Sequence, residues 1–136
     1  MEHLMHLNWL AVAVCAVIYF AIGGIWYSPL LFSKKWVELS KADPEKGKSQ
    51  MPMMFANAFF CGALASIGIA LLLSYTGITA IPAAIKLGLL CGGCFGFTSL
   101  SMSYTFGQRP IGLLLIDSFY HIISLVAVSS ILCMWH

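Results

Sequence analysis

Four long apolar runs constrain the fold of this chain more than any other feature of its sequence. They cover residues 7–27, 53–75, 80–104 and 111–135, and each has the roughly 20 residues that a helix needs to cross a membrane. The chain has 136 residues, of which 60% are hydrophobic and 9% charged. Because a soluble domain carries about 25% charged residues and one this small could not bury so much apolar surface, the solvent around most of this chain must be lipid. We therefore predict an all-α, polytopic membrane protein with a single transmembrane domain over residues 1–136.

The connections between the runs predict how the helices are arranged. Residues 76–79 and 107–110 form short turns, which make successive helices antiparallel neighbours, whereas the first loop, residues 28–52, is longer. We therefore expect an antiparallel four-transmembrane-helix bundle. Lys and Arg favour the cytoplasmic side of a membrane. Arg109 lies in the third loop, and the opposite side has only Lys86. The first loop holds the remaining basic residues, Lys34, Lys35, Lys41, Lys46 and Lys48. This bias places loops one and three in the cytoplasm and the N- and C-termini outside.

The first loop contains a short amphipathic segment. Phe32, Trp36 and Leu39 recur at helical spacing, and Lys34 and Lys35 lie off that stripe. Such a segment can lie in the headgroup plane with its lysines near anionic lipid. We predict a short interfacial helix in loop one, and the alternative is a solvated linker.

Small residues recur every four positions on the second and third predicted helices. In membranes such stripes let two helix backbones approach closely. We predict that the two stripes face each other, and the alternative is that the glycine stripe forms an oligomer interface. The predicted packing residues are Gly88, Gly92 and Gly96 on the third helix, and Ala58, Gly62 and Ser66 on the second.

Polar residues on the last helix form the candidate site. Asp117 is the one carboxylate deep within a predicted span, and His121 follows four residues later, where the two side chains could pair. An ionisable residue in a span costs at least about 2.5 kcal/mol and therefore suggests a function. We predict a cytoplasm-facing pocket that binds a small polar ligand or handles a proton. Its expected members are Asp117, His121, Tyr120, Ser124, Asn57, Thr98, Ser101, Trp26 and Arg109. The alternative is that Asp117 and His121 only fix the register of the bundle.

Other kinds of site are not predicted. Cys91 and Cys94 match the CxxC pattern, but they lie in mid-helix, whereas a redox pair needs an exposed thiolate at a helix N-terminus. The terminal histidines His3, His6 and His136 could share a metal ion only if the termini meet, and we expect no metal and no cofactor. The net charge of +2 with the basic residues in one loop does not suggest a nucleic-acid partner. No nucleotide-binding or hydrolase motif is present, so an enzyme is the last of the alternatives.

The segment 23–36, with its Gly-Gly-Ile-Trp-Tyr-Ser-Pro core, resembles the signature of a family of small bacterial membrane proteins. The family is catalogued as domain of unknown function 1761. The resemblance extends through residues 92–96 to Arg109 and Pro110, and so covers nearly the whole chain. It implies a four-helix protein of the bacterial cytoplasmic (inner) membrane and implies no activity, catalytic residue or cofactor.

The sequence thus favours a small membrane protein that binds or translocates a small polar solute or a proton. The alternative is a structural or accessory protein that binds lipid or a membrane-protein partner, and a membrane enzyme comes third. We expect membrane lipid as a partner and a homo-oligomer as the assembly, because four helices alone enclose little volume.

Overall fold

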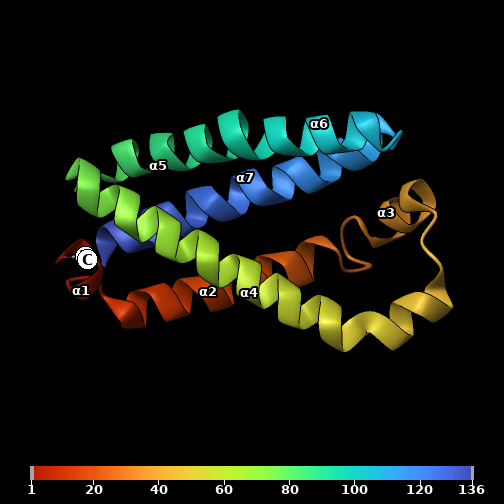
Figure 1. The fold of residues 1–136 in the computed structure, drawn as a ribbon, viewed down its shortest axis with the longest axis horizontal. Helices are drawn as coiled ribbons and strands as arrows, with labels where there is room; N and C mark the ends of the chain where they lie inside the picture. The colour runs from red at the N-terminus through yellow and green to blue at the C-terminus, as the bar shows by residue number, and fades with distance from the viewer. Residues whose placement is uncertain (1, 136) are drawn as a thin grey trace.

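A computed structural model describes residues 2–135 of the chain, and most of them lie in helices (Figure 1). No strand occurs within these residues. The elements in chain order are α1 (Glu2–Met5), α2 (Trp9–Trp26), α3 (Ser33–Ser40), α4 (Pro44–Thr76), α5 (Ile81–Leu90), the π-helix η1 (Cys91–Phe97), α6 (Thr98–Phe106) and α7 (Ile111–Met134). Four segments are long and apolar enough to cross a membrane, namely Trp9–Trp26, Pro44–Thr76, Ile81–Phe106 and Ile111–Met134. The predicted all-helical class and the four apolar helices are confirmed.

The second long helix begins earlier than its apolar run. Its N-cap is Asp43, whose carboxylate accepts a hydrogen bond from the Glu45 backbone N–H at 3.0 Å, and Pro44 occupies the first turn. An acidic cap followed by proline is a strong helix start, since proline there gives up no intrahelical hydrogen bond. Residues 44–52 of the predicted loop are therefore helical and form the polar first turns of α4.

The third apolar segment is one long helix whose middle turns are wider than those of an α-helix. Residues Cys91–Phe97 form the π-helix η1 between α5 and α6. This is the glycine-rich stretch that also contains Cys91 and Cys94. Gly92, within η1, lies directly against α7, where an added Cβ would lie 2.8 Å from the Ile122 Cα atom. π turns are rare and break the regular hydrogen-bond ladder, which glycine tolerates well.

Gly88 and Gly92 of the third segment pack against α7 and not against α4. A Cβ atom at Gly88 would lie 2.7 Å from the Val126 Cα atom, and Gly92 has the equivalent contact with Ile122. Figure 1 shows α5, η1 and α6 running beside α7 for most of its length. The predicted contact between the two small-residue stripes is therefore wrong, since Gly88 and Gly92 pack on α7 and Gly62 packs on α2.

The small residues of α4 face α2. Gly62 lies against the Tyr19 side chain, with its hypothetical Cβ 3.3 Å from the Tyr19 Cβ atom. Ser66 is fully buried and donates a hydrogen bond to the Gly62 carbonyl at 2.8 Å. Gly96 contacts only the carbonyl of its own helix, at Cys91, and Ala58 is half-buried. The short turn after α4 brings α5 beside α7. The stripe of the third segment therefore packs against α7, and the stripe of α4 packs against α2.

The last helix, α7, forms the centre of the fold. In the most apolar 18-residue stretch of α7, 44% of the residues are buried. In the third segment, which lies at the edge, the corresponding share is 17%. Both α2 and the third segment pack on it, and α4 crosses it (Figure 1). Its inward face carries most of the buried polar side chains of the described residues: Asp117, Ser118, Ser124 and Ser129.

The chain after α2 folds back over the end of the helices. Phe32 packs on Trp26 with a ring-centroid distance of 4.8 Å, and Trp36 lies edge-on to Tyr27 at 6.1 Å. Leu39 fills the space beside Gly112, near the start of α7. The apolar stripe of α3 thus faces the protein at the end where α7 begins (Figure 1).

Candidate functional site

Asp117 lies at the meeting point of three helices and has both carboxylate oxygens hydrogen-bonded. Its side chain is 7% exposed. Tyr27 donates its hydroxyl to Oδ1 at 2.5 Å, and Tyr104 donates to Oδ2. Tyr27 follows α2 and Tyr104 lies in the last turn of α6, so one carboxylate on α7 ties the ends of two other membrane-spanning segments together.

The sequence just before Tyr27 explains its position. Gly23 leaves room for the Tyr120 ring of α7, because an added Cβ would lie 2.9 Å from the Tyr120 hydroxyl. This close approach lets Trp26 donate its indole N–H to the Ile116 carbonyl at 3.0 Å. The helix ends at Trp26, and the Tyr27 backbone N–H caps it by bonding to the Gly23 carbonyl. The Tyr27 side chain then points toward Asp117.

Tyr27 lies just beyond the span of α2. Burial raises the pKa of the Tyr27 phenol well above its usual range, and the hydrogen bond to Asp117 raises it further. The phenol therefore stays protonated through the alkaline range in which an exposed tyrosine ionises, and it remains a donor to Asp117.

The Trp26 hydrogen bond gives a first testable prediction. Trp26→Phe removes the indole N–H and leaves the Ile116 carbonyl without that donor, so we expect a loss of about 1 kcal/mol in the free energy of unfolding. Reversible unfolding in mixed detergent micelles measures the loss. Trp9→Phe is the matched control, since Trp9 is 50% exposed and should change stability little. Equal effects of the two substitutions would contradict the prediction.

His121 bonds to a different partner from the predicted one. Its Nδ1 atom is 2.7 Å from the Tyr19 hydroxyl of α2, whereas Asp117 is occupied by Tyr27 and Tyr104. The Tyr120 ring lies between the two groups, 5.4 Å from the Tyr27 ring and 5.7 Å from the Tyr19 ring. The predicted direct Asp117–His121 pair is therefore replaced by two hydrogen-bonded groups on successive turns of α7.

The other predicted members of the site are only partly brought together. Asn57 and Thr98 are exposed and bond within their own helices, to Cys61 and to the Cys94 carbonyl. Ser101 is half-buried on α6. Ser124 is fully buried on α7, and within the described residues its hydroxyl has no hydrogen-bond partner.

Arg109 borders the site from the exposed side. Its guanidinium carbon lies over the Tyr104 ring, 5.4 Å from the ring centroid. Tyr104 thus contacts Arg109 with its ring face and Asp117 with its hydroxyl. Tyr27 and Tyr104 are members of the site that the sequence did not predict. The one available signal was the position of Tyr27 and Tyr104 at the same end of the bundle as Asp117.

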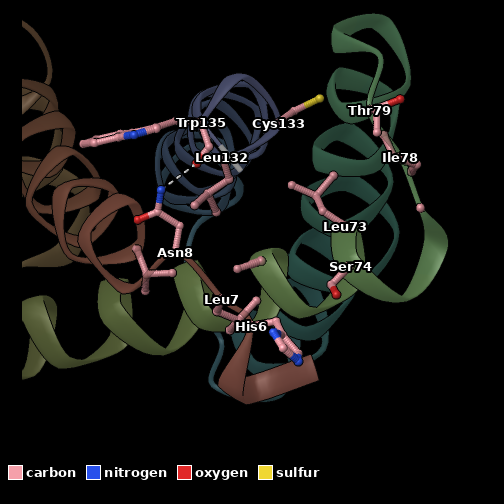
Figure 2. A pocket seen from close by; sticks show the side chains of 13 residues that line it. His6, Leu7, Asn8, Leu73, Ser74, Ile78, Thr79, Leu132, Cys133 and Trp135 are labelled. Carbon is pink, nitrogen blue, oxygen red and sulfur yellow. Dashed lines mark hydrogen bonds between the residues drawn. The ribbon is translucent and has the colours of Figure 1, made fainter. Parts of the chain in front are cut away.

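Two cavities lie away from Asp117. The first, of about 270 Å³, is at the far end of the helices, where α2 begins and α4 and α7 end (Figure 2). Its lining is mostly apolar, with Leu73 and Leu132 among its walls and His6, Asn8, Ser74 and Thr79 as polar members. Asn8 donates a hydrogen bond to the Trp135 carbonyl at 3.3 Å across one edge (Figure 2). The second, of about 450 Å³, is a groove between α3 and the turn that leads into α7.

The terminal histidines do not assemble a metal site within the described residues. No group of three or more His, Cys, Asp and Glu side chains in residues 2–135 could hold a metal ion. His3 bonds to the Ser74 hydroxyl at 2.8 Å, and His136 lies outside the described residues.

Comparison with known proteins gives one match. A family model described as "Protein of unknown function (DUF1761)" matches residues 10–133, which is nearly the whole chain. No curated protein matches the sequence, and no solved structure matches it.

Proposed function

This chain belongs to the DUF1761 family, and we propose that it is a multi-pass membrane protein that takes up and releases a proton at Asp117. The observation that carries the proposal is a buried carboxylate, inside an apolar helix, that accepts hydrogen bonds from tyrosines of two other segments. An ionisable group at such a depth is costly and usually serves a function.

The proposed setting is a bacterial inner membrane crossed by four antiparallel helices. The lysines of residues 28–52 and Arg109 lie at the end where α7 begins, so the positive-inside rule places this end in the cytoplasm. The N- and C-termini are then outside. Asp117, in the second turn of α7, lies in the cytoplasmic half of the membrane.

In this arrangement α3 lies at the cytoplasmic interface. Its Trp36 and Leu39 side chains face the helix ends, while Lys34 and Lys35 are exposed. An eight-residue helix with lysines on its exposed side suits the headgroup region of an anionic membrane.

The geometry favours a proton over a larger solute. Both Asp117 oxygens are occupied, and the two cavities described above lie elsewhere. The side chains around Asp117 carry exchangeable protons on Tyr27, Tyr104 and Tyr120, and the Tyr19–His121 pair continues this series one turn deeper.

Proton uptake would change the packing of the helix ends. A carboxylate accepts from both tyrosines, whereas a protonated carboxyl must donate one hydrogen bond itself. One tyrosine then has to turn its hydroxyl or give up its bond. Protonation of Asp117 is thereby coupled to the positions of Tyr27, at the end of α2, and Tyr104, at the end of α6.

Asp117→Asn tests this proposal. Asparagine has nearly the same shape and can bond to both tyrosine hydroxyls, but it cannot exchange a proton. We expect wild-type protein in liposomes to pass protons after an imposed pH step, with valinomycin and potassium balancing charge, and Asp117→Asn to lower that rate at least tenfold. An enclosed pH-sensitive dye reports the rate.

The matched control is Ser118→Ala. Ser118 is the buried neighbour of Asp117, and within the described residues its hydroxyl has no hydrogen-bond partner. It should leave the rate unchanged. Wild-type flux in Asp117→Asn, or a wild-type rate equal to that of empty liposomes, would contradict the proposal.

The second candidate is a structural or accessory protein that binds lipid or another membrane protein. The complete hydrogen bonding of Asp117 favours it, because a carboxylate with two tyrosine donors can join helices without exchanging a proton. Under this alternative Asp117→Asn weakens the fold and no protein-dependent proton flux exists. A homo-oligomer with bound membrane lipid is the assembly that we propose in either case, and cross-linking in native membranes measures it.

A further inference from the structure

The groove between α3 and the turn before α7 is the larger and the more polar of the two cavities described above. Its volume is about 450 Å³. The wall from α3 and its C-cap consists of Glu38, Leu39, Ser40 and Lys41, and the wall from the turn and α7 consists of Gln108, Arg109, Pro110 and Leu113. The two walls are far apart in sequence, so the groove exists only in the folded chain.

Two cations from opposite walls line the groove. Lys41 caps the end of α3 in a left-handed backbone conformation, with φ of 51°, and Arg109 comes from the turn between α6 and α7. Glu38 is the only carboxylate among the described lining residues. No carboxylate in residues 2–135 forms an ion pair with Lys41 or Arg109. The charges of the groove therefore sum to one excess positive charge that no described group neutralises.

The chemistry of the lining fits a phosphate oxyanion. Guanidinium groups bind phosphate with two parallel hydrogen bonds, and lysine adds a point charge. Ser40 and Gln108 supply further donors. Basic pockets at the ends of membrane-spanning helices are common sites for anionic headgroups.

We infer that this groove binds a phosphate group, carried either by an anionic lipid headgroup or by a free phosphate. The inference needs only the groove and stands apart from the proton chemistry proposed for Asp117. Arg109 also contacts Tyr104, so the bound phosphate would lie one residue away from the Asp117 network.

Binding to the purified chain in a non-ionic detergent tests the inference. Native mass spectrometry would count bound short-chain phosphatidylglycerol, with phosphatidylcholine of the same chain length as the zwitterionic comparison. A parallel titration with inorganic phosphate, followed by tryptophan fluorescence, tests the free anion. Binding of phosphatidylglycerol alone identifies a headgroup site, and binding of inorganic phosphate identifies a site for the free anion. Binding of neither probe overturns the inference.

The double variant Arg109→Gln with Lys41→Gln should weaken binding at least tenfold. Its matched control is Lys34→Gln with Lys35→Gln, which removes the same charge from exposed positions of α3 outside the groove. Lys41→Gln alone, at an exposed position that contacts neither Asp117 nor its tyrosine donors, should give a smaller loss and keep the fold intact. Equal losses in the two double variants would mean diffuse attraction to the lysine-rich loop, and would overturn the inference.

Discussion

Replacing Asp117 with alanine should destabilise the folded chain by about 3 kcal/mol. The substitution removes the acceptor of two hydrogen bonds to a charged group, each of which contributes about 1.5–3 kcal/mol. It also leaves the hydroxyls of Tyr27 and Tyr104 without their partner in a largely buried place. Reversible unfolding in mixed detergent micelles, followed by far-ultraviolet circular dichroism, measures the change.

The comparison with Asp117→Asn makes this prediction specific. Asparagine offers an oxygen to one tyrosine and an N–H to the other, so it should lose less than half as much stability as alanine. A third variant, Glu38→Ala, removes an exposed carboxylate and should change stability little. The account fails if Asp117→Ala is as stable as the wild type, since the network would then contribute nothing to the joining of the helices.

Gly88→Ala should be the most damaging single-methyl change in the chain. The new Cβ would lie 2.6 Å from the Ser129 Oγ atom, 2.7 Å from the Val126 Cα atom and 2.9 Å from the Leu125 carbonyl oxygen. Two of these atoms belong to the backbone of α7, so the helices must move apart. Overpacking of this kind costs about 1–3 kcal/mol, and the same unfolding experiment measures it.

Gly93→Ala is the control for Gly88→Ala. Gly93 lies in the same membrane-spanning segment, and an added Cβ there meets no atom within 4 Å. Its effect should stay within about 0.5 kcal/mol, as for most substitutions that create no contact. If the two alanine variants are equally stable, the contact between the third segment and α7 is not as close as the structure has it.

The sequence predicted the helices well because their signal is local. Each apolar run needs only its own length and composition to be recognised, and the four runs became four long helices. The start of α4 was not predicted because it lies outside the apolar run, although Asp43 and Pro44 together form a strong helix cap. The composition of residues 44–52 is polar, and the apolar pattern carries no information there.

Packing partners could not be obtained from the stripes alone. A glycine stripe shows that some helix approaches closely, but it does not identify which helix. Gly88 and Gly92 pack against α7, and Gly62 packs against α2. The choice depends on how the turns at residues 77–80 and 107–110 direct the helices, which is a property of the whole fold.

The structure gives Asp117 and His121 other hydrogen-bond partners than the sequence predicted. Helical spacing predicted that Asp117 and His121 pair, since residues four apart are neighbours on one helix. In the structure tyrosines of other segments reach each of them, namely Tyr27 and Tyr104 for Asp117 and Tyr19 for His121. Tyrosines near a membrane interface are expected for other reasons, so nothing in the sequence distinguished these from the aromatic belt.

Infrared difference spectroscopy of the protein in liposomes tests the central claim most directly. Protonated carboxyl groups absorb apart from carboxylates, and a buried one keeps a distinct band. If Asp117 exchanges a proton inside the bundle, a pH step should reveal a carboxyl band that is present in the wild type and in Ser118→Ala and absent in Asp117→Asn. A wild-type spectrum with no carboxyl band that depends on Asp117, at any pH at which the protein stays folded, would contradict the account.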